Sequence, residues 1–146
     1  MAYADQTAVE GEFKDVTFSA TTAVTDTDVG RFLVEEEAVL NGLLKPVYTV
    51  PITGTMALSI CKMLLIKLVK SRIVAIMEVK TGGKTPDQGD PESKIIKDEV
   101  MGLIEKLQNK SMLLPDATFA NSGSAVRSYA AENGLEPTFE KDTESW

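Results

Sequence analysis

Side chains that commonly perform catalysis are scarce in this 146-residue chain, and the candidates stand apart from one another. Histidine is absent, which excludes catalytic triads built on imidazole and zinc sites of the cysteine–histidine kind. The single cysteine, Cys61, lies in an apolar stretch, where a lone thiol is usually a small core residue. We therefore predict no catalysis by Cys61, and one cysteine cannot form a disulfide within the chain.

A phosphate-binding loop is matched only at its last residues, Gly83-Lys84-Thr85. The full motif needs a glycine five residues before Gly83, where this chain has Glu78. It also needs a helix directly after the loop, and Pro86 follows instead. The sequence therefore predicts no nucleotide and no other cofactor.

Acidic residues that would bind a metal ion or act as catalytic carboxylates are also badly placed. Asp87 and Asp90 lack a glutamate at the closing position of a calcium loop. Residues 35–37 are three consecutive glutamates, and on a helix such neighbours point in different directions. The sequence therefore predicts no metal site, no catalytic site and no enzymatic activity.

The most apolar element is a predicted helix from Thr55 to Val79. Its polar residues recur at roughly helical spacing and form one narrow stripe: Ser59, Lys62, Lys67, Lys70, Ser71 and Glu78. Charged residues interrupt the helix before it reaches the ~18 consecutive apolar residues of a membrane span, so we predict that it does not cross a membrane and that no membrane is a partner. A helix that is apolar on most sides must be covered, either by the other helices or by a neighbouring subunit.

The charge of the chain is uneven around this helix. The net charge of −7 argues against general nucleic-acid binding, which usually needs a basic patch. Residues 51–80 carry five basic and one acidic side chains, whereas the segments before and after them are acidic. We expect the glutamates at 35–37, or Asp98 and Glu99, to lie near the basic helix and to set the register between elements.

Capping and turn signals predict an all-α fold in three parts. Residues 1–25 form an extended N-terminal arm, residues 26–115 a small helical bundle, and residues 116–146 an extended C-terminal tail. The bundle has about three main helices: one capped by Thr25 or Asp26 and ending near Lys45, the apolar helix, and one capped by Asp90. Residues 81–92 between the last two form an exposed loop. The first residues, MAYADQ, show no basic region followed by an apolar run, so we expect a protein that is made and used without export.

The C-terminal tail contains four widely spaced aromatic residues among serine, asparagine, glycine and acidic residues. They are Phe119, Tyr129, Phe139 and Trp146. Such a segment buries little surface by folding on itself and gains more from the pockets of another protein. We therefore predict that these four residues bind a partner.

The order of these parts resembles the head–tail connector (adaptor) proteins of tailed bacteriophages. The matching segments are 29–44 (VGRFLVEEEAVLNGLL), 48–52 (YTVPI), 57–64 (ALSICKML), 103–107 (LIEKL) and the aromatic-ended 137–146 (PTFEKDTESW). The resemblance covers most of residues 13–146 as a pattern of helices and turns. The chain departs from it at Leu44-Lys45, where the family often has Arg-Tyr, and at 109–111, where it often has glycine.

The resemblance implies a structural role in the phage neck. Such proteins form a homo-oligomeric ring, commonly a dodecamer, under the portal protein of the DNA-filled head, and present a surface to a stopper or tail completion protein. Their tails usually dock on the portal, and genome DNA passes through the channel without specific binding. We expect a virion protein at the head–tail interface, assembled in the host cytoplasm. The alternative is a small cytoplasmic helical protein that binds and regulates a partner, as a monomer or dimer.

Overall fold

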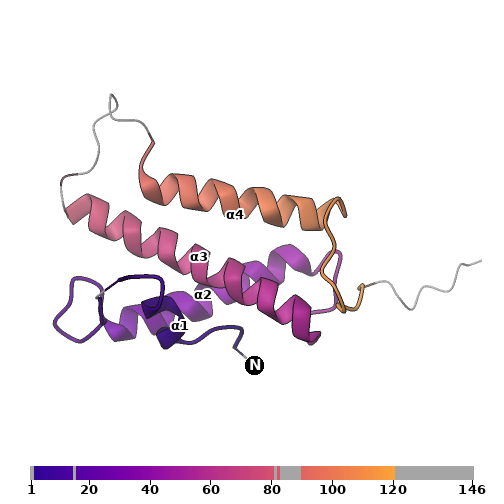
Figure 1. Ribbon diagram of the computed structural model, residues 1–146, viewed down its shortest axis with the longest axis horizontal. Coiled ribbons are helices and arrows are strands. Elements are labelled where there is room, and N and C mark those ends of the chain that lie inside the picture. The colour runs from indigo at the N-terminus through magenta and orange to yellow at the C-terminus, as the bar shows by residue number, and fades with distance from the viewer. Residues whose placement is uncertain (1, 15, 81, 83–89, 121–146) are drawn as a thin grey trace, which may run out of the picture.

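The computed structural model describes residues 2–14, 16–80, 82 and 90–120, and the regular elements within them are helices. The helices are α1 (Gln6–Glu10), α2 (Asp26–Leu44), α3 (Thr55–Lys80) and α4 (Glu92–Gln108). Figure 1 shows α3 in the middle, with α4 running antiparallel along one side and α2 crossing the other. The predicted all-α bundle of three main helices is confirmed.

Helix α2 begins where the sequence predicts it. The hydroxyl of Thr25 accepts a hydrogen bond from the Asp28 N–H (3.1 Å), and the Asp28 carboxylate accepts one from the Thr25 N–H (3.2 Å). Hydrogen bonds from the side chain and then the backbone of Thr25 lower the pKa of Asp28. The helix ends at Leu44, and Lys45 still has helical backbone angles (φ −51°, ψ −36°). Pro46 prevents continuation because it has no N–H to donate and its ring clashes with the carbonyl four residues earlier.

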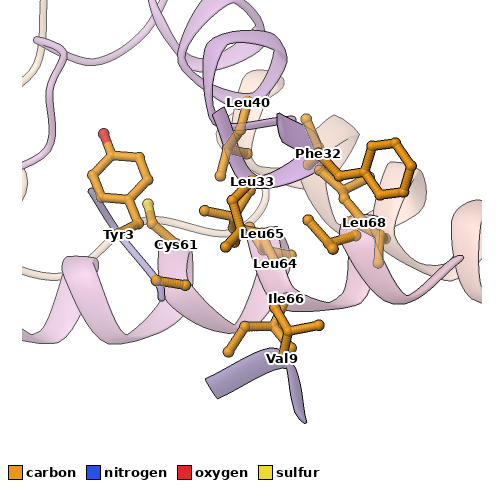
Figure 2. Packing of buried hydrophobic residues seen from close by; sticks show 14 of the residues in the cluster. Tyr3, Val9, Phe32, Leu33, Leu40, Cys61, Leu64, Leu65, Ile66 and Leu68 are labelled. Carbon is orange, nitrogen blue, oxygen red and sulfur yellow. The ribbon is translucent and has the colours of Figure 1, made fainter. Parts of the chain in front are cut away.

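Helix α3 is about 39 Å long at 1.5 Å per residue, and nine of its 26 residues are buried. Figure 2 shows Cys61, Leu64 and Leu65 of α3 packed near Leu33 and Leu40 of α2. Lys62 of the predicted polar stripe is exposed, but Ser71 is buried. The Ser71 hydroxyl donates a hydrogen bond to the Leu68 carbonyl (2.8 Å), so it needs no contact with water. The prediction that Ser71 belongs to an exposed polar stripe is therefore wrong.

The N-terminal segment departs from an extended arm, because part of it is helical and it packs on the bundle. Val9 of α1 is fully buried, and Tyr3 and Phe18 are also buried. The Tyr3 hydroxyl donates to Asn41 Oδ1 (2.6 Å) and accepts a hydrogen bond from the Ile52 N–H (2.8 Å). A few spaced apolar residues thus bury this segment, although its composition is mostly polar.

Helix α4 begins one residue later than the sequence predicts. Pro91 occupies the capping position without a side-chain hydrogen bond, and Asp90 forms an exposed ion pair with Lys94 (3.0 Å) instead of capping the helix. Glu78 of α3 accepts hydrogen bonds from the backbone and hydroxyl of Ser93. Pro91 has no side-chain acceptor for the first amides of α4. The Glu78 carboxylate, from another helix, accepts the hydrogen bond of the Ser93 amide instead.

Candidate partner-binding site

Of the four aromatic residues predicted to bind a partner, the structure places one, Phe119; Tyr129, Phe139 and Trp146 lie outside the described residues. The Phe119 ring stacks on Tyr48 with centroids 5.2 Å apart and planes at 23°. The Lys110 ammonium lies 5.8 Å from the Phe119 centroid. Phe119 remains 37% exposed, so its inner face contacts this chain while part of its ring is accessible.

Backbone hydrogen bonds fix this aromatic residue at the turn between α2 and α3. Tyr48 and Phe119 form an antiparallel bridge. The Thr49 N–H donates to the Thr118 carbonyl (2.7 Å), and the Ala120 N–H donates to the Val47 carbonyl (2.9 Å). Residues 121–146 therefore follow from a defined point at one end of the bundle.

Tyr48 is the buried support of this arrangement. Its side chain is fully buried, and its hydroxyl accepts a hydrogen bond from the Leu114 N–H (3.2 Å). The residue thus contacts the segment after α4 with both its ring and its hydroxyl. Its place beside Pro46 and Pro51 predicts only a connector, and no local signal reveals its partner 66 residues later.

Asp116 holds the same segment to the start of α3. Its carboxylate oxygens accept hydrogen bonds from the backbone N–H groups of Met56 (3.1 Å) and Ala57 (3.0 Å). Gly54 makes this approach possible, because a Cβ atom there would lie 2.4 Å from the Asp116 carbonyl oxygen. Residues 116–120, which the sequence assigns to the tail, therefore contact the bundle.

Ion pairs connect α3 to its acidic neighbours, as the charge pattern predicts. Arg72 pairs with Glu35 and Glu36 of α2 (3.2 Å to Glu36), and Lys67 pairs with Glu99 of α4 (2.8 Å). A further ion pair, which no sequence pattern indicates, joins Lys70 to Glu12 near α1 (3.3 Å). Each pair is partly exposed, so it contributes to register more than to stability.

The described residues among those considered for catalysis or metal binding do not come together. Burial raises the pKa of the Cys61 thiol to about 11, so the nucleophilic thiolate is rare near neutral pH. Among the described residues, no three acidic, cysteine or histidine side chains are grouped as a metal site requires. The Gly83-Lys84-Thr85 motif, Asp87 and most of the predicted loop at 81–92 lie outside the described residues.

Comparison with known proteins gives no assignment: no family model, curated protein or solved structure matches the chain. Within the described part of the chain, no helix is both long and apolar enough to cross a membrane. Any function must therefore be argued from the arrangement of residues.

Proposed function

We propose that this protein is a head–tail connector of a tailed bacteriophage. In this role it forms a ring that joins the portal of the DNA-filled head to a stopper or tail completion protein and extends the DNA channel. The resemblance of its parts to that family motivates the proposal. The observation that carries it is the point at which the bundle ends and the tail begins.

The chain after α4 returns to the α2–α3 turn and is held there at three places. Asp116 caps α3, Thr118 and Ala120 pair with the connector, and Phe119 stacks on Tyr48. A fixed attachment point keeps the start of the tail at this end of the bundle, which limits the region within which Tyr129, Phe139 and Trp146 can meet a partner. This arrangement supports docking of the tail on the portal.

Exposed apolar side chains on the described helices support assembly with further protein. Val34, Met56 and Val79 are each more than half exposed, although smaller side chains such as Ala57 are fully buried. Met56 and Val79 lie near opposite ends of α3, so each is available for a separate contact. The acidic net charge is also compatible with a channel that lets DNA pass without holding it.

The mass of the purified protein, measured alone and with its cognate portal ring, tests the proposal. A connector should add to the portal as a set of copies matching the ring symmetry, with the virion as its final location. A monomer or dimer that does not bind the portal would contradict the proposal. That result would favour the alternative, a small cytoplasmic protein that regulates a different partner.

A further inference from the structure

An open apolar groove lies between the first half of α2 and the last turns of α3. It has a volume of about 480 Å³ and is lined chiefly by Arg31, Phe32, Arg72, Ile76, Val79 and Lys80. Val79 is 80% exposed, and the Arg72 guanidinium lies 4.2 Å from the centroid of the Phe32 ring. The groove thus has an apolar floor and a cationic rim, and no acidic residue lines it.

Two lysines near the groove form no ion pair among the described residues, although Asp28 lies close enough to Lys80 for that charge to help lower the pKa of Asp28. Lys80 donates to a neutral acceptor, the Ala23 carbonyl (3.0 Å). Lys97 lines an adjoining cavity that shares Arg72 with the groove. This side of the molecule therefore offers apolar surface together with two lysines that form no ion pair, beside the paired guanidinium groups of Arg31 and Arg72.

The opposite combination lies on the far side of α4. Ile95 is 55% exposed, and Glu92 and Asp98 flank it at i−3 and i+3, where helix neighbours meet. Neither acid forms an ion pair within the described ranges. Ile95 lies about 160° around the helix from Lys97, so this acidic ridge (Glu92, Ile95 and Asp98) faces away from the groove side.

We propose that the groove of one subunit receives the acidic ridge of the next copy of the same chain. Ile95 packs against Ile76 and Val79, while Glu92 and Asp98 meet Lys80 and Lys97. This proposal rests on the ring assembly proposed above and names its subunit contact. Because two different surfaces meet, the contact is heterologous and can repeat around a closed ring.

The level of the two surfaces along the bundle is compatible with ring closure. The groove lies at the last turns of α3, and the ridge lies at the first turns of α4, which runs antiparallel to it (Figure 1). Both surfaces are therefore at the same end of the molecule. Neighbouring copies can join them side by side without the axial rise that would produce an open filament.

Disulfide trapping tests this contact directly. A chain carrying both Val79→Cys and Ile95→Cys, oxidised at increasing protein concentration, should give a ladder of dimers, trimers and higher species. A mixture of the two single variants should give dimers only, and each single variant alone should give none. Wild-type protein is the control, since buried Cys61 should not cross-link.

Charge reversal then tests the pairing of lysines with acids. In the two-cysteine chain, Lys80→Glu with Lys97→Glu should remove the ladder, and adding Glu92→Lys with Asp98→Lys should restore it. Lys45→Glu with Lys62→Glu is the matched control, because both lysines are exposed and outside the two surfaces. Circular dichroism checks that each variant keeps its helical content.

Three results would overturn the proposal. They are the absence of a ladder, a ladder that the reversal of charge leaves unchanged, and a ladder lost on deletion of residues 132–146, which would assign the groove to the tail. Portal binding is measured separately. A ladder without portal binding would support this subunit contact and contradict the connector role. Portal binding without a ladder would support the connector role and contradict this contact.

Discussion

Asp116 joins two parts of the chain that are 60 residues apart in the sequence. Its positive φ of 52° turns the carboxylate toward the start of α3, where two amides have no partner within the helix. The side chain acts as an N-cap supplied from outside the helix. It therefore determines where α3 begins and also where the C-terminal segment is attached.

We predict that Asp116→Ala lowers the free energy of unfolding by about 1 kcal/mol, the usual cost of losing a capping side chain. Chemical denaturation followed by circular dichroism measures it. Asp90→Ala is the control, since Asp90 precedes α4 without capping it and its pair with Lys94 is exposed. Equal effects of the two substitutions would contradict the capping role of Asp116.

Leu65 tests the position of α3 at the centre of the core. It is fully buried, so Leu65→Ala should lower the free energy of unfolding by about 2–5 kcal/mol through lost burial and a residual cavity. Leu113→Ala removes the same atoms from a side chain that is 54% exposed and should cost much less. An unchanged denaturation midpoint for Leu65→Ala would be incompatible with the observed packing.

At the scale of the elements, local signals predict most of the helix bounds and fail where the partner is distant. Thr25 and Pro46 act on adjacent backbone, so both ends of α2 follow from the sequence. The packing of Tyr3 depends on residues 38 and 49 positions away, which no periodicity in a short polar segment indicates. The capping of α3 by Asp116 was missed for the same reason.

Substitutions at two glycines test the effect of close packing and the effect of helix propensity separately. Gly54→Ala should destabilise the protein by about 1–3 kcal/mol, because the new Cβ would meet Asp116 atoms at 2.4–2.6 Å. Gly30→Ala should stabilise it by about 0.5–1 kcal/mol, because Gly30 lies inside α2 with no atom within 4 Å of the added Cβ. Thermal unfolding of both variants measures the difference, and changes of the same sign would contradict this account.

At the scale of the whole molecule, the two ends of the bundle have different features. One end holds Tyr48, Phe119 and Asp116, from which the tail follows. The other end holds the cationic groove at Val79 and the acidic ridge at Ile95. In the proposed ring, the second end supplies the contacts between subunits. The first end then remains available for the portal, so the two kinds of contact do not compete for one surface.

The tail provides the last prediction. Deleting residues 136–146 should leave the thermal unfolding of the bundle unchanged, because every buried residue of the described core precedes them. The deletion should weaken or abolish docking on the portal, because it removes Phe139 and Trp146. Trp146 is the only tryptophan of the chain, so its fluorescence reports on this segment alone. On binding, its emission should shift to the blue as the indole leaves water.

A matched variant separates the aromatic anchors from the charge of the tail. Phe139→Ala with Trp146→Ala keeps all acidic residues and should weaken docking as the deletion does. Glu140→Gln with Glu144→Gln keeps both rings and should retain most of the affinity at physiological salt, where exposed charges are screened. Undiminished docking of the deleted protein, or Trp146 emission that stays at its value in water within the complex, would reject the tail as the portal-binding element. The bundle and its proposed subunit contact would then have to account for any binding that remains.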